Sequence, residues 1–184
     1  RDAFRPINTL PLAKIWPDGK KEVLNQYRKR DDSVKAKVCG GFENKVAIIS
    51  AYPGADPEII DYYVDKGYKG IIISSTALGH VPGYTQKKKD SWLPVLKRAV
   101  DSGVFVGNAS QTIYGRVHPH VYRQLIELEQ MGIVFLEDLL VETAYVKLMW
   151  ALSQTKDLKR VKEIMLTNYV GEFNQRIVPE AFLY

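Results

Sequence analysis

Residues 46–75 read VAIISAYPGADPEIIDYYVDKGYKGIIISS, and this stretch decides the fold class. Short apolar runs, VAIIS and GIIIS, stand near its two ends and are typical of buried strands. Between them, Asp56 suits the N-cap of a helix, Pro57 its first position and Gly67 its left-handed C-terminal cap. Strands that are apolar throughout and alternate with helices predict a parallel sheet that is covered on both faces.

The same alternation continues toward the C-terminus. Asp90 or Ser91 can cap the next helix, and Asp157 is a good N-cap for the last one. The pattern predicts further strands over 104–107 and 133–136 and helices over 92–102, 120–130, 142–154 and 157–169. We therefore expect an α/β fold with an open, mostly parallel sheet of about four strands and helices on both faces, of the flavodoxin-like kind.

The first 45 residues are less regular than the rest. A strand is predicted in PLAKIW, residues 11–16, while KKEVLNQYRKRDD carries a turn signal at Asp18–Gly19 before it and reads as strand or helix. We interpret residues 1–45 as an interdomain linker with a strand and residues 46–184 as a C-terminal α/β domain. Since the chain starts at Arg1 rather than Met, we expect a fragment of a longer protein, although an omitted disordered start would look the same.

Composition narrows the class of protein. With 184 residues and 46% hydrophobic content, the chain is long enough to bury a core, and its net charge of +5 permits only a weak preference for polyanions. The single cysteine, Cys39, excludes an intrachain disulfide and fits a reducing compartment. The sequence has neither a long apolar run nor a signal-peptide pattern, so we expect a cytoplasmic protein without a membrane partner.

Three loops are predicted at the carboxyl ends of the strands, where open α/β sheets bind ligands. They are AYPGAD from residue 51, STALGHVPGY from residue 75 and NASQTIYGRVHPH from residue 108. The second loop combines hydroxyl groups, glycines that allow close backbone approach and His80, a potential proton carrier. The alternative is a polar strand-to-helix turn without a ligand.

Known catalytic motifs do not account for these loops. His118 and His120 have no third metal ligand at a recognised spacing, so we predict no metal site. Glu137 or Asp138 could join a serine and a histidine in a triad, but the GxSxG nucleophile motif is missing. Neither a GxxxxGK[ST] nor a GxGxxG phosphate loop is present, and we therefore expect no cofactor in this chain.

Five motifs in order carry a family resemblance. They are RDAFRPIN (1–8), GYKGIIISSTALGHVP (67–82), SQTIYGRV (110–117), EDLLVETAYVKLMWALSQTKD (137–157) and IMLTNYVGEF (164–173). Together they resemble the C-terminal half of the GatD family, the D-type subunits of archaeal glutamyl-tRNA(Gln) amidotransferases, within the bacterial-type L-asparaginase superfamily. The resemblance implies a C-terminal asparaginase-like domain that spans nearly the whole chain.

The resemblance also implies an activity and partners. A longer protein of this kind releases ammonia from glutamine. An E-type partner subunit uses ATP and Mg²⁺ to activate the glutamate, so that Glu-tRNA(Gln) becomes Gln-tRNA(Gln). The family's nucleophile is a threonine in a TGGTI-like motif, which this sequence lacks. We therefore assign no catalytic residue and expect the chain alone to be inactive.

The role implied for this domain is homodimer contact and the lining of a site. The resemblance makes Thr76, Gly79 and His80 candidates for lining the substrate pocket of the neighbouring protomer. The loop departs from the family pattern at Ser75 and at Ala77, where glycine is usual. Alanine disfavours the positive φ that glycine accepts.

Two other functions remain open. One is the C-terminal domain of a plain L-asparaginase. The other is a non-catalytic module that binds tRNA or protein through YRKRDD, residues 27–32, and the Lys87–Lys89 run. Lysine-rich runs of this kind also occur as ordinary solvated surface.

Overall fold

The computed structural model describes residues 5–182, and the chain divides into two compact units. The larger unit is Gly41–Phe173, and the smaller one combines residues 1–40 with 174–184 as far as these are described. In residues 5–182 no helix is both long enough and apolar enough to span a membrane.

The smaller unit contains a β-hairpin. Strand β1 (Ala13–Ile15) pairs antiparallel with β2 (Lys21–Val23), and the turn between them has Gly19 at φ 83°. The Asp18 carboxylate accepts a hydrogen bond from the backbone N–H of Lys20, 2.9 Å away. The predicted strand and turn are thereby confirmed, and the ambiguous residues that follow them begin as a strand. Residues 24–45 contain no regular secondary structure, and near the C-terminus lies a short 3₁₀-helix, η2 (Pro179–Phe182).

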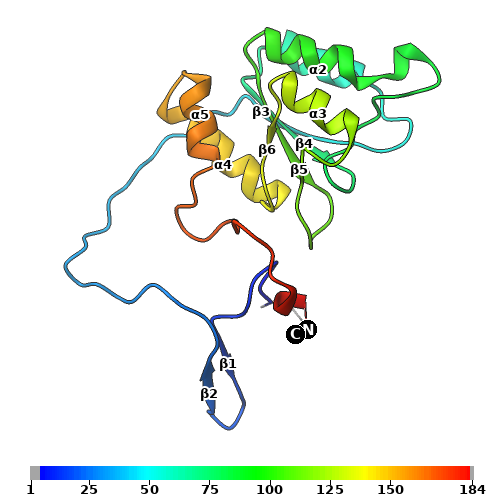
Figure 1. Ribbon diagram of the computed structural model, residues 1–184. Helices are drawn as coiled ribbons and strands as arrows, with labels where there is room; N and C mark the ends of the chain where they lie inside the picture. Colours follow the sequence, from blue (N-terminus) through cyan, green and yellow to red (C-terminus); the bar gives the residue numbers. More distant parts are fainter. Residues whose placement is uncertain (1–4, 183–184) are drawn as a thin grey trace. The chain divides into compact units, whose positions relative to one another are not determined.

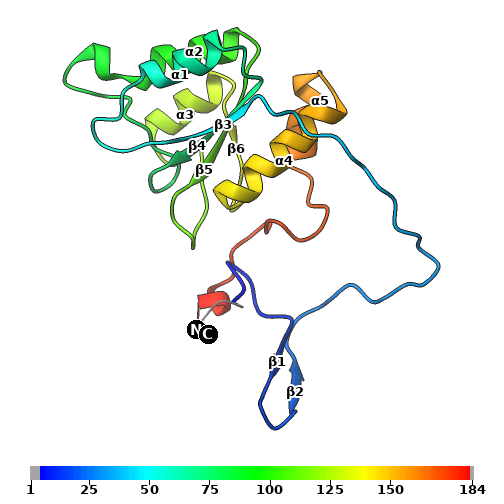
Figure 2. The same ribbon diagram turned by 180° about the vertical axis from the view of Figure 1, so that it is seen from behind.

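The larger unit is built on a four-stranded sheet. Its strands are β3 (Val46–Ser50), β4 (Gly70–Ser75), β5 (Phe105–Ser110) and β6 (Val134–Phe135), and all neighbouring pairs are parallel. The strands follow one another across the sheet in chain order (Figures 1 and 2). Because right-handed crossovers in one direction all fall on the same side, this order places the three connecting helices on one face.

The helices form two layers around the sheet. The connecting helices α1 (Glu58–Asp65), α2 (Trp92–Asp101) and α3 (Arg123–Gln130) lie on one face, with a 3₁₀ turn, η1 (Lys88–Asp90), before α2. Helices α4 (Val141–Gln154) and α5 (Leu158–Met165) cover the other face, as Figure 1 shows. The predicted α/β class, with a parallel sheet and helices on both faces, is confirmed.

Each face of the sheet has its own apolar core. On the α1–α3 side, Ile71 and Ile73 of β4 pack in the same cluster as Trp92 and Leu96 of α2, and the Trp92 indole donates to the Ala55 carbonyl at 3.0 Å. On the α4–α5 side, the buried residues include Ile72, Phe105, Leu148 and Val161. The alternation of Ile71, Ile72 and Ile73 between the two clusters follows from the period of two residues along a strand.

Helix caps agree with the sequence, but some helix limits do not. The Ser91 hydroxyl accepts from the Leu93 N–H at 3.3 Å, and the Asp157 carboxylate from the Lys159 N–H at 3.0 Å. The helix predicted over 120–130 begins only at Arg123, three residues later than expected. The helix predicted over 157–169 ends at Met165, because the residues that follow it bind to α4 instead.

Candidate functional site

The carboxyl edge of the sheet opens into a hollow of about 500 Å³. Its polar lining comes from the ends of three adjacent strands, with Ser50 on β3, Ser74 on β4 and Ser110 on β5. The first turn of α4 closes another side, and the exposed carboxylate of Glu142 stands there. The remaining lining residues are Ile48, Ala51, Tyr52, Gln111, Thr112, Ile113, Leu140 and Val141. The hollow thus lies where open parallel sheets bind ligands.

Gln111 ties the floor of this hollow together. Its side-chain amide Nε2 donates to the carbonyl of Ala51 at 2.6 Å and to that of Ser74 at 2.8 Å. Its own N–H donates to the Ser75 carbonyl at 2.8 Å. One side chain after β5 therefore fixes the chain at the ends of β3 and β4. The sequence indicates this loop but not its bridging role, because the two acceptors lie 60 and 37 residues away.

The loop after β4 forms a tight turn over residues 76–80. The N–H of Thr76 donates to the His80 carbonyl at 3.0 Å, and the N–H of His80 donates back to the Thr76 carbonyl at 2.9 Å. The carbonyl of Leu78 accepts from the His118 N–H at 2.9 Å. Two side chains of β5 complete the set, because the Ser110 hydroxyl donates to the Ala77 carbonyl and the Asn108 amide to the Gly79 carbonyl, both at 2.8 Å. Every carbonyl of the turn thus accepts a hydrogen bond.

Two residues of the turn have positive φ angles. Ala77 has φ 46°, which is the left-handed region, so the substitution away from the glycine usual in the family leaves alanine in a conformation that glycine adopts more easily. Gly79 has φ 120°, and a Cβ built there would lie 2.6 Å from Cε1 of Phe135. The turn therefore needs glycine at 79 for both conformation and space.

The three residues predicted to line a substrate pocket differ in exposure. Thr76 is exposed, and its hydroxyl donates to the His80 carbonyl at 3.2 Å. Gly79 is buried beneath the turn, and the partly buried imidazole of His80 packs against the Tyr122 ring, with 5.1 Å between ring centroids. Within the described residues, none of the three belongs to the lining of the 500 Å³ hollow. Their role toward a neighbouring protomer stays a prediction.

Two further histidines named from the sequence lie side by side after β5. The rings of His118 and His120 are 5.7 Å apart, and the His120 N–H donates to Nδ1 of His118 at 3.2 Å. Nδ1 of His120 lies 3.5 Å from the Glu129 carboxylate. Residues 5–182 contain no cluster of three or more His, Cys, Asp or Glu side chains that would hold a metal.

Glu137 and Asp138, considered above for a triad, follow β6. Glu137 forms an ion pair with Arg116, and its carbonyl accepts from the Val117 N–H at 2.9 Å. Asp138 is buried. The hydroxyls of Ser75 and Ser110 donate to backbone carbonyls. The contacts of Glu137 and of these two serines therefore give no support to a catalytic triad.

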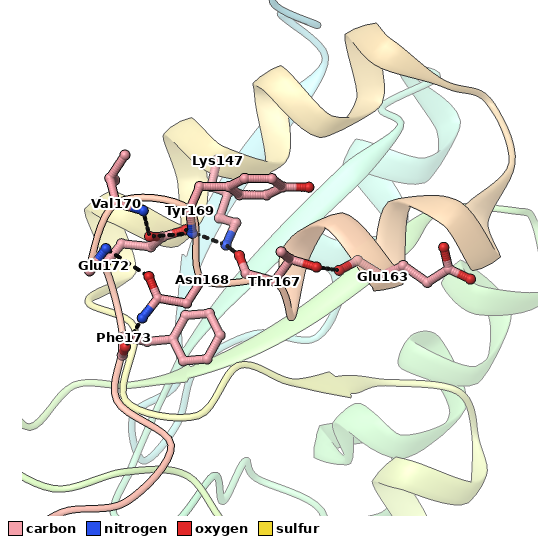
Figure 3. Close-up of polar contacts among 9 residues, drawn as sticks. Lys147, Glu163, Thr167, Asn168, Tyr169, Val170, Glu172 and Phe173 are labelled. Carbon is pink, nitrogen blue, oxygen red and sulfur yellow. Dashed lines mark hydrogen bonds and ion pairs between the residues drawn. The ribbon is translucent and has the colours of Figure 1, made fainter. Parts of the chain in front are cut away.

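A buried ion pair that the sequence did not reveal lies in α4 (Figure 3). The Lys147 ammonium donates to the Glu172 carboxylate and to the Thr167 carbonyl, both at 2.6 Å. The Tyr169 and Phe173 rings lie over the same ammonium, at 5.4 and 5.1 Å from their centroids. The ion pair thus connects residues 167–173 to α4, and together with the bond from the Thr167 hydroxyl to the Glu163 carbonyl it explains why α5 ends at Met165.

The electrostatics of this pair reflect burial and compensation. Burial lowers the pKa of Lys147, and the bond to Glu172 opposes that shift. For Glu172, burial alone would raise the pKa, but the Lys147 ammonium and the backbone N–H groups of Tyr169 and Val170 outweigh it, and the pKa falls to about 2. Strongly shifted groups are often catalytic. Here both partners are satisfied within the protein, so we assign the pair a structural role.

Comparison with known proteins defines the class. The family model of the glutaminase/asparaginase C-terminal domain matches residues 45–165. The chain belongs to this family.

Curated relatives narrow the similarity. Each of them is a D-type subunit of glutamyl-tRNA(Gln) amidotransferase. The chain is 50% identical over 184 residues to that of Pyrococcus furiosus, 47% over 184 residues to that of Thermococcus kodakarensis, and 48% over 178 residues to that of Metallosphaera sedula. These alignments cover 96 to 100% of the chain but only 38 to 40% of the relatives. The resemblance inferred from the five motifs is therefore confirmed, and the chain spans about two-fifths of the length of these relatives.

Solved structures agree on the fold. The L-asparaginase of Thermococcus kodakarensis superposes with a TM-score of 0.78 at 26% identity, over 94% of this chain and 50% of that chain. L-asparaginase I of Vibrio cholerae gives a TM-score of 0.75 at 26% identity, over 91% of this chain and 48% of that one.

Proposed function

We propose that this chain is the C-terminal domain of a glutamine-hydrolysing subunit of a tRNA-dependent amidotransferase, acting in the cytoplasm. The complete enzyme would release ammonia from glutamine and, with an E-type partner that uses ATP and Mg²⁺, convert Glu-tRNA(Gln) into Gln-tRNA(Gln). The observation that carries this proposal is the identity of about one residue in two with the amidotransferase relatives along the whole chain. Identity to the L-asparaginases of known structure is lower, at 26%.

Within that enzyme, the domain would contribute to dimerisation and complete the substrate site of a neighbouring protomer. The proposed contact is the turn at residues 76–80, with Thr76 and His80 facing the substrate and Gly79 allowing close packing. The hydrogen-bonded carbonyls of the turn support this role, because a rigid turn positions its side chains without a further entropic cost. The nucleophile would come from the remainder of the longer protein.

A chimeric enzyme tests the proposal. In the amidotransferase relative from Pyrococcus furiosus, the segment aligned to this chain is replaced by these 184 residues, and the product is combined with its E-type partner. We expect glutamine-dependent conversion of Glu-tRNA(Gln). His80→Ala in the chimera should lower kcat/KM for ammonia release by about 10-fold, the effect of losing one hydrogen bond of roughly 1.4 kcal/mol.

The matched control is His120→Ala, which removes an exposed histidine that lies beside Glu129. It should retain the activity of the parent chimera. A chimera that folds but hydrolyses asparagine in preference to glutamine would support the plain L-asparaginase instead. Ammonia release by the 184-residue chain alone would contradict the division of labour between the two parts.

The second candidate function, a tRNA-binding module, is favoured by one observation. Residues 26–37 contain five basic and two acidic side chains, all exposed and without regular secondary structure. In a gel-shift titration, binding through such a segment should weaken steeply between about 50 and 200 mM salt, since every neutralised phosphate releases counterions. Replacing Arg28, Lys29 and Lys35 by Ser should abolish it. Absent or salt-independent binding would eliminate this candidate.

A further inference from the structure

Asn108 is a polar side chain in the middle of an apolar layer. It lies on β5, pairs in register with Ile73 and Phe135, and is completely buried. Its amide Nδ2 donates to the Gly79 carbonyl at 2.8 Å, whereas its Oδ1 is buried and accepts no hydrogen bond from the described residues. A buried acceptor without a partner costs free energy, on the order of 1–3 kcal/mol. The bond from Nδ2 to the turn offsets part of that cost.

Ser110 repeats this contact two residues further along the strand. Because side chains at i and i+2 lie on the same face of a strand, Asn108 and Ser110 face the turn together. Their acceptors, the carbonyls of Gly79 and Ala77, are also two residues apart. We call these two side chains the β5 clamp. The clamp fixes the turn at two points, and between them lies the Leu78 carbonyl, to which the His118 N–H donates.

The clamp acts on the geometry of His80. Gly79 directly precedes His80, whose N–H and carbonyl both bond to Thr76 across the turn. Fixing the Gly79 carbonyl therefore fixes the peptide plane from which the His80 side chain departs. The ring of His80 then packs edge-on against Tyr122, at an interplanar angle of 60°.

We propose that Asn108 and Ser110 are positioning residues, which aim His80 by clamping the carbonyls of Gly79 and Ala77. This inference rests on the proposed function insofar as His80 faces a substrate. The mechanical part, that the clamp sets the place of the His80 ring, stands on the contacts above and is tested separately.

The first experiment uses the 184-residue chain and NMR. In Asn108→Ala, the His80 ring protons should lose the chemical-shift displacement that the Tyr122 ring current causes. The amide hydrogens of Gly79 and His80 should exchange at least about 10-fold faster relative to those of α2. Ser110→Ala should move the same signals in the same direction.

Ser75→Ala is the control. The Ser75 hydroxyl is buried on the same sheet and donates to the Ala109 carbonyl at 3.0 Å rather than to the turn. This variant should lower overall stability without selectively changing His80. If Asn108→Ala does not fold, Ser110→Ala decides alone. Unchanged His80 signals in a folded clamp variant would overturn the proposal.

The second experiment uses the chimeric enzyme. If the clamp acts through His80, Asn108→Ala should reduce kcat/KM about as much as His80→Ala, and the double variant should lose no more than either single one. Independent, multiplying losses would contradict a positioning role. An active His80→Ala chimera would refute the proposed function, while the NMR result would still decide whether the clamp fixes His80.

Discussion

Gly79 combines two demands that no other residue meets. Its φ of 120° disfavours any side chain, and a Cβ would overlap the Phe135 ring at 2.6 Å. We expect Gly79→Ala to lower the free energy of unfolding by about 3 kcal/mol, from backbone strain and overpacking together. Urea denaturation followed by circular dichroism measures the change.

Gly54→Ala separates the two causes. Gly54 has φ 83°, but a Cβ there would meet no atom within 4 Å. This variant should lose only about 1 kcal/mol, the cost of the backbone conformation. Equal losses at both positions would mean that the Phe135 contact contributes nothing.

Ala77 presents the opposite case, a residue that tolerates strain. Its φ of 46° costs about 1–2 kcal/mol for alanine, while glycine in its place would add roughly 0.5–1 kcal/mol of unfolded-state entropy. Ala77→Gly should therefore stabilise the chain by up to about 1 kcal/mol, measured by the same denaturation. Ala55→Gly, at a buried position without positive φ, should destabilise it. A loss of stability in Ala77→Gly would show that the turn is not strained.

The predicted site residues illustrate what sequence patterns reach. The loop after β4 is recognisable because glycines, hydroxyls and His80 follow an apolar strand. The roles of Asn108 and Gln111 are not, because they depend on acceptors 29 to 60 residues distant. Lys147 is equally hidden, since it interrupts the apolar stripe of α4 and looks like a solvent-facing lysine.

At the scale of the element, the Lys147–Glu172 pair fixes where α5 stops. The Glu172 pKa is about 2 in the folded chain and 4.5 in its ordinary state, so between these values the unfolded chain binds more protons. The pair's contribution is therefore complete above about pH 4.5 and is lost as the pH falls toward 2. We expect about 3 kcal/mol of stability to disappear over that window.

Glu172→Gln should remove this part of the pH dependence and lower stability at neutral pH by about 3 kcal/mol, because it leaves the buried ammonium of Lys147 without its counter-ion. Thermal unfolding from acid to neutral pH measures both effects. Adding Lys147→Met should recover part of the loss, since the stranded charge is then gone. An unaltered pH profile in Glu172→Gln would disprove the assignment.

The elements themselves were predictable to different degrees. Strands and caps follow from local chemistry, so β3, β4 and the caps at Ser91 and Asp157 appear where the sequence places them. The ends of helices depend on partners elsewhere. The sequence from Leu166 to Tyr169 fits a helix, yet Lys147 binds the Thr167 carbonyl and directs the chain away from α5.

At the scale of the whole molecule, both apolar cores lie within Gly41–Phe173. A protein reduced to residues 41–173 should therefore still unfold cooperatively, with a melting temperature within a few degrees of that of the full chain. Circular dichroism melts compare the two. A broad or missing transition in the shorter protein would show that residues 1–40 or 174–184 contribute to the core.

The strand order also sets the order in which the two sides of the sheet are completed during synthesis. The sheet ends at Phe135, and by then α1, α2 and α3 have already emerged to shield one side. The other side, with Ile72 and Phe105, waits for α4 and α5. A nascent chain that pauses before residue 141 consequently presents a bare apolar surface, which is the state most exposed to chaperones and to aggregation.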